Sequence, residues 1–339
     1  MNNNIYGIDL GTCNFKIFCK SNNKIFKEKN TIALRGRNEI FDYGDKAYAM
    51  YEKAPENIQV VFPVVSGVIA EFNYLQEFMY EYLEGKMKGK TKGAEFIVAV
   101  PTDITEVEKR AFYEVFYKSK FKPKSVLLCE KPIADAVGLG IDVNEPTGVM
   151  VVNMGADTTE ISVISLGGLV LSTLLHFGGN RLDEAIISYV RKEFNLVIGQ
   201  KTAMALKENL GSGLPGRTET MVIVGRDVVS GLPIEKELSA EVIYDAINVH
   251  LESICTSIKM ILEKTPPELA KDIIHSGIYI TGGGSKINKL DRLFEEITNI
   301  KVNTCEDPED SAVRGLVQIV SDAKYKKLPF TIKGNNLKL

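Results

Sequence analysis

The sequence predicts an α/β fold with two related halves, and three observations support this prediction. The segment IYGIDLGTCNFKIFC, from Ile5 to Cys19, is an apolar run interrupted by a polar turn at 11–14, as in a strand, a tight turn and a second strand. The segment GVMVVNMGADTTEISVI, from Gly148 to Ile164, repeats this pattern. Elsewhere, apolar runs of strand length alternate with stretches of helical periodicity. The matched hairpins indicate two halves that face each other across a cleft.

The other elements follow from periodicity. Apolar residues at helical spacing predict helices over residues 73–83, 105–117, 132–139, 181–194, 202–209, 240–262, 286–296 and 307–322. Short apolar runs predict strands at 96–100, 125–129, 169–176, 219–224 and 278–281. Pro132 costs little in the first turn of its helix, because the amide hydrogen that it lacks has no helical partner there. Residues 28–70 combine short apolar runs with many charges and are assigned to a small inserted subdomain.

The composition limits the class of protein. The chain of 339 residues has a formal net charge of −3, with 45% hydrophobic and 25% charged residues, which suits a globular protein of two or more domains. Nucleic-acid binding is not expected from this charge. The five cysteines lack metal-ligand spacing and indicate a reduced, cytoplasmic compartment. The start, MNNNIYGIDL, is no signal peptide, and no apolar run approaches the roughly 18 residues of a membrane span.

Three motifs resemble those of the superfamily of actin, the sugar kinases and the heat-shock chaperone ATPases. GIDLGTCN, which begins at Gly7, is similar to its first phosphate motif, residues 153–159 stand at the second, and TGGGS, which begins at Thr281, is similar to its adenosine motif. Further segments resemble the MreB family of bacterial actins in order along residues 4–322: GVIAEF, GGNRLDEAI, PPELA, EDP and AVRG. The chain is therefore identified as a member of that family.

The resemblance implies an actin-like, ribonuclease-H-like fold around a cleft that binds ATP or ADP with Mg²⁺. Subdomain IA would comprise residues 1–27 and 71–145, IB 28–70, IIA 146–180 and 248–322, and IIB 181–247, with a basic tail at 323–339. The resemblance also implies filaments on the inner face of the cell membrane that serve cell shape or motility. The partners would be further copies of this chain and paralogous filament proteins.

The resemblance also implies roles for individual residues. Asp9 would hold Mg²⁺ through water, Asn153 stands at the position of a second carboxylate, and Glu130, Lys131 and Thr158 stand at catalytic positions. The expected nucleotide contacts are Gly11, Thr12, Cys13 and Asn14 in the first turn, Gly155, Ala156, Asp157 and Thr158 in the second, Met204, Lys207 and Glu208 on a helix, and Gly282, Gly283, Gly284, Ser285 and Lys286 in the adenosine loop. Backbone amides in such turns and at a helix N-terminus can bind phosphate.

Several positions depart from the family pattern. The second phosphate motif, DIGGGTT in the family, reads NMGADTT here, so Asn153 replaces a carboxylate and Asp157 brings a charge that repels phosphate into a turn that needs close backbone approach. Lys131 stands where the family has the Glu that orients or deprotonates the attacking water, and Met204 stands where a carboxylate is expected. An ammonium cannot act as that base at its usual pKa, and losing such a group typically slows a reaction about 10²–10⁴-fold. Weak or slow ATP hydrolysis is expected.

Alternatives stay open for these substitutions. Lys131 and Asp157 form an ion pair that keeps the local charge near that of the family, or Asp157 holds the water shell of Mg²⁺ and Glu130 acts as base. The alternative functions are a non-hydrolysing scaffold that assembles with active paralogues, and a superfamily enzyme such as a sugar kinase. For the kinase, no carboxylate aimed at a substrate hydroxyl can be named.

Two basic segments are candidate contacts with an anionic membrane. One is the tail from Lys324 to Leu339, KYKKLPFTIKGNNLKL, which carries five lysines and no acidic residue, and the other is the loop from Lys86 to Lys92. Each basic residue near an anionic leaflet contributes about 1 kcal/mol, so the tail predicts salt-sensitive attachment. A solvated, disordered tail is the alternative.

Overall fold

The computed structural model describes residues 4–36, 39–87 and 91–332, and the chain divides into two compact units. Unit 1 comprises Met1–Pro146, Ile164–Leu174 and Glu309–Leu339, and unit 2 comprises Thr147–Val163 and Leu175–Pro308. The boundary crosses the β-hairpin formed by residues 159–175, and the last α-helix, residues 311–321, belongs to unit 1. The predicted limits of subdomain IIA, by contrast, place residues 309–322 in the second half of the molecule.

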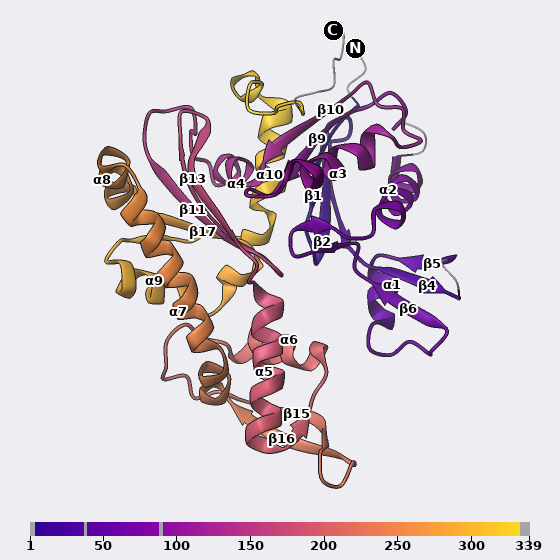
Figure 1. Cartoon of the computed structure of the whole chain (residues 1–339), viewed down its shortest axis with the longest axis vertical. Coiled ribbons are helices and arrows are strands. Elements are labelled where there is room, and N and C mark those ends of the chain that lie inside the picture. Colours follow the sequence, from indigo (N-terminus) through magenta and orange to yellow (C-terminus); the bar gives the residue numbers. More distant parts are fainter. Residues whose placement is uncertain (1–3, 37–38, 88–90, 333–339) are drawn as a thin grey trace. The chain divides into compact units, whose positions relative to one another are not determined.

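Two five-stranded sheets share one order of strands (Figure 1). The first runs β3 (Lys24–Lys29), β2 (Asn14–Cys19), β1 (Ile5–Leu10), β9 (Glu95–Val100) and β10 (Ser125–Glu130). The second runs β13 (Gly168–Leu175), β12 (Thr159–Ser165), β11 (Val149–Met154), β17 (Ile278–Thr281) and β18 (Val302–Asn303). In each sheet three consecutive strands are followed by two later ones that continue it in parallel from the first strand. The α/β class with two related halves is confirmed.

Different helices cover the two faces of the first sheet. Alternate residues of a strand point to opposite faces, and Tyr6 and Ile8 of β1 join the core that contains side chains of α2 (Phe72–Met87) and α3 (Glu106–Tyr117). At Gly7, an added Cβ would lie 2.8 Å from the Cβ of Leu316 in α10 (Ser311–Ser321). The helix α10 packs against α4 (Lys131–Gly138). Asp9, two residues after Gly7, therefore points to the face that α4 and α10 cover.

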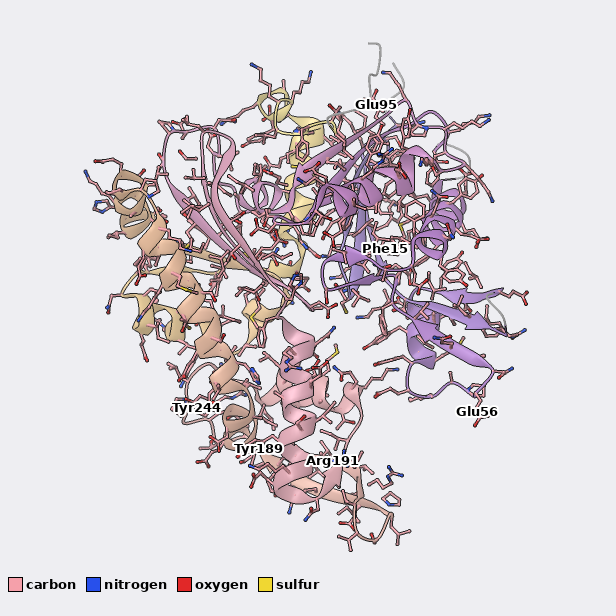
Figure 2. The ribbon with its side chains drawn as sticks, viewed as in Figure 1. Phe15, Glu56, Glu95, Tyr189, Arg191 and Tyr244 are labelled. Atoms are coloured by element: carbon pink, nitrogen blue, oxygen red, sulfur yellow. The ribbon has the colours of Figure 1, made fainter. Side chains whose placement is uncertain are left out.

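Aromatic side chains fill the core of unit 1. Phe15 of β2 (Figure 2) is fully buried. Its ring meets Phe78 and Tyr82 edge-on, with ring centroids 5.2 and 4.9 Å apart. Edge-to-face pairs of this kind add about 0.5–1.5 kcal/mol to the gain from burial. The packing holds the β1–β2 hairpin, whose turn carries the first group of predicted site residues.

The predicted small subdomain contains a separate sheet. Its strands, in the order β5 (Glu39–Tyr43), β4 (Ile32–Arg35) and β6 (Ile58–Val61), lie beside α1 (Asp45–Met50), and a short hairpin of β7 (Val64–Val65) and β8 (Val68–Ile69) follows. The strand β3 reaches Lys29 and belongs to the first sheet. The small sheet therefore begins a few residues later than the predicted limit of 28.

Besides strands of the second five-stranded sheet, unit 2 contains helices and a small three-stranded sheet. The helices are α5 (Gly179–Phe194), α6 (Gln200–Leu210), α7 (Ala240–Lys264), α8 (Pro267–Ser276) and α9 (Leu290–Thr298), and the small sheet orders β14 (Leu196–Val197), β15 (Thr220–Asp227) and β16 (Pro233–Ser239). The helix α8 lies outside the predicted helices, and Pro266 and Pro267 are its N-cap and first residue. The strand β16 lies outside the predicted strands because it is mostly exposed and polar.

The basic tail is part of unit 1 as far as Ile332. Tyr325, in the short turn η3 (Ala323–Tyr325), is buried, and Phe330 pairs with Leu128 of β10 through backbone hydrogen bonds of 2.9 and 2.8 Å. Phe330 and Ile332 pack against the core. Residues 324–332 are thus ordered, with Lys324, Lys326 and Lys327 exposed to solvent, while 333–339 lie outside the described residues. No helix in the described ranges is long and apolar enough to cross a bilayer.

Candidate functional site

Asn30 holds the first turn, residues 11–14, through two hydrogen bonds. The Asn30 side chain donates a 2.9 Å hydrogen bond to the carbonyl of Gly11, and its backbone amide donates one of 3.0 Å to the carbonyl of Cys13. The turn is tight, because a Cβ at Gly11 would lie 2.7 Å from the Asn14 carbonyl oxygen. The four turn residues Gly11, Thr12, Cys13 and Asn14 are half-buried.

Beside this turn, the carboxylate of Asp9 lies between two lysines. Lys16 stands opposite Asp9 in the β1–β2 register, and its Nζ lies 3.2 Å from Oδ2. The Nζ of Lys131, the first residue of α4, lies 3.6 Å from Oδ1. Lys16 also donates to the backbone carbonyl of Glu309. Asp9 and Lys16 are almost fully buried, whereas the Lys131 side chain is 20% exposed.

The two ammonium groups decide the charge state of Asp9. Burial by itself raises the pKa of a carboxyl, but Lys131 and then Lys16 outweigh that effect and hold the pKa of Asp9 below its ordinary value. Lys131 in turn stands at a helix N-terminus, where the helix dipole disfavours a cation. The carboxylate of Asp9 offsets this cost, so Asp9 and Lys131 stabilise each other.

Sequence reasoning missed Lys16, although a signal for it was present. A lysine within the apolar strand β2 is unusual, and the turn at 11–14 already places that position opposite Asp9. The predicted ion pair of Lys131 with Asp157 stays a prediction, because Asp157 belongs to the other compact unit. Glu130, the alternative base, is the N-cap residue of α4. Burial raises the pKa of Glu130, and Lys109 partly opposes this.

These residues do not fit Mg²⁺ held in the way the resemblance implies. Mg²⁺ prefers carboxylate oxygens and keeps several of its waters, but each oxygen of Asp9 faces an ammonium group, and Asn153 offers a neutral amide. The described parts of the chain contain no group of three or more His, Cys, Asp or Glu side chains that could hold a metal ion.

The second turn, residues 155–158, is braced by the loop at the start of α5. Its own closing bond runs from the Gly155 amide to the Thr158 carbonyl, 2.8 Å. The amides of Gly179 and Asn180 donate to the carbonyls of Gly155 and Ala156, 3.0 and 2.7 Å. A Cβ at Gly178 would lie 2.6 Å from the Ala156 carbonyl oxygen, so the two loops touch through their backbones.

The carboxylate of Asp157 is hydrogen-bonded to a side chain of the neighbouring loop. Its Oδ1 accepts a 2.7 Å hydrogen bond from the side-chain amide of Asn180. The amide moderates the repulsion that a carboxylate in this turn would exert on phosphate, without cancelling its charge. Gly178 and Asn180 lie in the quoted segment GGNRLDEAI but were not among the predicted site residues.

Of the three predicted contacts on α6, Met204 and Lys207 are half-buried and Glu208 is exposed. The Nζ of Lys207 lies 2.8 Å from Oδ1 of buried Asp183 and donates to the carbonyl of Gly179, 2.8 Å. Lys207 thus ties α6 to the start of α5. The nucleotide contacts predicted for these three residues stay predictions.

The adenosine loop packs on the end of β11. Gly282 has a φ of 82°, and a Cβ there would lie 2.4 Å from the Met154 carbonyl oxygen and 2.5 Å from Oδ1 of Asn153. A Cβ at Gly284 would meet the Met154 side chain at 2.4 Å, whereas at Gly283 it would meet nothing within 4 Å. Ser285 donates to the Gly282 carbonyl, 2.7 Å. Close approach thus requires Gly282 and Gly284, and Gly283 lies open.

The helix predicted directly behind this loop is wrong in its limits. Residues Gly283–Lys286 form a short 3₁₀ turn, and α9 begins only at Leu290. The loop is fixed instead by two bonds to the Pro308 carbonyl, from the Thr281 hydroxyl at 2.7 Å and from the Gly282 amide at 3.0 Å. Three backbone-rich loops, at 155–158, 178–180 and 282–286, therefore meet around the carboxyl end of β11 in unit 2.

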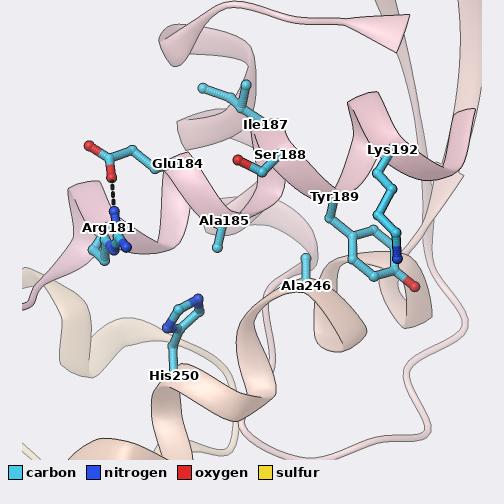
Figure 3. A pocket seen from close by; sticks show the side chains of 9 residues that line it. All are labelled: Arg181, Glu184, Ala185, Ile187, Ser188, Tyr189, Lys192, Ala246 and His250. Atoms are coloured by element: carbon cyan, nitrogen blue, oxygen red, sulfur yellow. Dashed lines mark hydrogen bonds and ion pairs between the residues drawn. The ribbon is translucent and has the colours of Figure 1, made fainter. Parts of the chain in front are cut away.

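A separate pocket lies between α5 and α7 (Figure 3). His250 faces the Arg181 side of α5, and Arg181 pairs with Glu184 at 2.7 Å. Burial, and then the charge of Arg181, lowers the pKa of His250. The ring of His250 stacks on Phe177, which leads into the Gly178 loop. None of the predicted nucleotide or catalytic residues lines this pocket.

The chain is similar to cell-shape proteins of bacteria. The family model described as MreB/Mbl protein matches residues 3–328. The cell shape-determining protein Mbl of Bacillus subtilis is 36% identical over 312 residues, 91% of this chain and 93% of that protein. The cell shape-determining protein MreB of Escherichia coli is 36% identical over 323 residues, 93% and 92% of the two chains. The structure of MreB5 of Spiroplasma citri bound to AMPPNP superposes with a TM-score of 0.89 at 32% identity, covering 93% of this chain and 95% of that one.

Proposed function

Because this chain belongs to the MreB/Mbl family and has its actin-like fold, we propose that it is an ATP- and ADP-binding cytoskeletal protein that assembles into filaments. The observation that supports nucleotide binding most strongly is the set of three backbone-rich loops around β11, where Gly178, Gly282 and Gly284 permit contacts that a Cβ would prevent. Structures of Spiroplasma citri MreB5 hold AMPPNP and ADP. The proposed role is in cell shape or motility.

We further propose that hydrolysis is weak or slow. Lys131 stands at the position of the family's catalytic Glu, and its ammonium group, which has no lone pair to accept a proton from water, lies 3.6 Å from Asp9. Glu130 is the nearest carboxyl along the chain, at the N-cap of α4. ATP would then act mainly as a structural ligand of the filament, and assembly with active paralogues would supply any turnover.

Phosphate release from ATP, measured at concentrations where the protein pellets, tests this proposal. The wild type is compared with Lys131→Glu and with Asn153→Asp/Asp157→Gly. We expect a wild-type rate near background that rises by at least tenfold when the family residues are restored. A wild-type rate well above background that the variants do not exceed would overturn the assignment of Lys131 and point to Glu130 or Asp157.

We also propose that the filament attaches to the inner face of the membrane through lysines of the tail. Its apolar residues Tyr325, Phe330 and Ile332 pack inward, so attachment would rest on charge rather than insertion. Lys326 and Lys327 are exposed, whereas Lys324 pairs with Asp142.

Vesicles rich in anionic lipid distinguish the two basic segments. Serine replaces Lys326, Lys327, Lys333 and Lys338 in one variant, and Lys86 and Lys92 in the other. The tail variant is expected to lose most co-sedimentation and the loop variant little. Undiminished binding of the tail variant would reject the tail as the attachment site.

A further inference from the structure

The cluster of Asp9, Lys16 and Lys131 has a property that hydrolysis does not explain. Both oxygens of one buried carboxylate face ammonium groups, one from β2 at 3.2 Å and one from α4 at 3.6 Å. Loss of hydrolysis requires only that position 131 no longer carries a carboxylate. It does not require that the new side chain also reaches Asp9, the residue that the resemblance assigns to the water shell of Mg²⁺.

The two lysines differ in what they can reach. Lys16 is 8% exposed and is anchored by Asp9 and by the Glu309 carbonyl, with Oδ1 of Asp310 at 4.0 Å. Lys131 is 20% exposed and projects from the first residue of a helix. Lys16 therefore neutralises Asp9 from within the sheet, and Lys131 supplies a positive charge at the edge of the cluster.

The charges of the cluster favour a polyanion and disfavour a divalent cation. Lys16 is shared between Asp9 and Asp310, which lie 3.2 and 4.0 Å from its Nζ, whereas Lys131 adds a second ammonium group beside Asp9, close to the first turn, whose half-buried residues are the predicted phosphate contacts. A hydrated Mg²⁺ that approached Asp9 would meet two like charges at short range, in a site where burial weakens screening.

We propose that the Asp9–Lys16–Lys131 cluster takes the place of Mg²⁺, so that this chain binds the polyphosphate of a nucleoside di- or triphosphate with little dependence on divalent cations. The inference rests on the proposed nucleotide binding and deepens it. Lys131 is then a binding residue, and Lys16 is a positioning residue that holds Asp9.

Binding of fluorescently labelled ADP and ATP to the full chain, in excess Mg²⁺ and in EDTA, tests the inference. The wild-type Kd is expected to change by less than about threefold on chelation, about 0.7 kcal/mol. For Lys131→Glu, which restores a carboxylate, we expect at least tenfold weaker binding in EDTA than in Mg²⁺. Lys53→Glu makes the same charge change at an exposed site and should keep the wild-type ratio.

The outcomes separate this inference from the proposed function. Wild-type binding that weakens tenfold or more in EDTA overturns the inference but leaves nucleotide binding intact. Absence of wild-type binding in both buffers overturns the proposed function itself.

A milder variant guards against misfolding of Lys131→Glu. Lys131→Gln removes the charge without adding a carboxylate beside Asp9, and it should weaken binding in EDTA more than in Mg²⁺. An unchanged ratio in a folded Lys131→Gln protein overturns the role of Lys131.

Discussion

The first glycine turn, at 11–14, follows β1, and the second, at 155–158, follows β11. The two sheets have the same strand order, yet different side chains balance the charge at each turn. At the first turn two ammonium groups hold Asp9. At the second turn Asn153 is neutral, and Asp157 is held by an amide of Asn180. The strand order thus fixes where a turn stands, whereas a few side chains decide which ions it tolerates.

The same contrast appears in how the two turns are shaped. The first turn is held by one residue, Asn30, through its side-chain amide and its backbone amide. The second is supported by backbone, through Gly178 and the amides of Gly179 and Asn180. Substitutions should therefore act through charge at the first turn and through steric fit around the second.

The largest effect is expected at the first turn. Lys16→Met removes one of the two cations from a buried carboxylate, and losing one partner of a buried pair costs about 3–5 kcal/mol. Chemical denaturation measures the loss in the free energy of unfolding. Asp9→Asn/Lys16→Met, which removes the charge as well, should recover at least half of it. Strict additivity of the two single changes would contradict the buried pair.

Next in size is a change in the adenosine loop. Gly282→Ala places a Cβ 2.4 Å from the Met154 carbonyl oxygen at a φ of 82°, and the left-handed backbone and the clash together should cost about 2–4 kcal/mol. Gly283→Ala, at the next residue of the chain and open to space, is the matched control and should be nearly neutral. Thermal unfolding of both variants checks this, and equal losses would contradict the close approach.

A smaller effect is expected at the second turn. Asn180→Ala removes the hydrogen bond to Asp157, and a bond to a charged group contributes about 1.5 kcal/mol or more. The carboxylate would then repel phosphate more strongly, and nucleotide affinity should fall about tenfold. Asn180→Ala/Asp157→Gly should restore it. If the double variant binds as weakly as the single one, Asn180 acts on the loop and not on the charge.

The smallest expected effect is the pH dependence that His250 of unit 2 contributes to stability. The folded-state pKa of His250 is lowered, first by burial and then by Arg181, so the native state binds fewer protons than the unfolded chain. Its contribution to stability is full above the unfolded pKa of about 6.5. It is lost as the pH falls from there through the folded pKa.

Unfolding at pH 7.5 and at pH 5 measures this loss. His250→Phe keeps the ring stack on Phe177 and should show a smaller loss than the wild type. An identical pH dependence in the two proteins would assign the effect to other groups.

The sequence alone determined the elements that local pattern encodes. The two hairpins, most helices and the positions of the glycine turns follow from periodicity and from residues such as Gly11 and Pro132, because these features depend on neighbours in the chain. Even the pairing of Asp9 with Lys16 is implicit in a hairpin that turns at 11–14. The polar strand β16 escaped detection because it has little buried face.

Only the tertiary structure decided which distant residues meet. It brought Lys131 from α4 to Asp9, the Gly178 loop to the second turn, and Phe330 of the tail to β10. It also grouped α10 with unit 1, where Gly315 lies so near Ala134 that an added Cβ would come within 1.7 Å of its carbonyl oxygen. Such contacts depend on how helices pack across a sheet, and no local pattern encodes the direction in which a lysine at a helix start will reach.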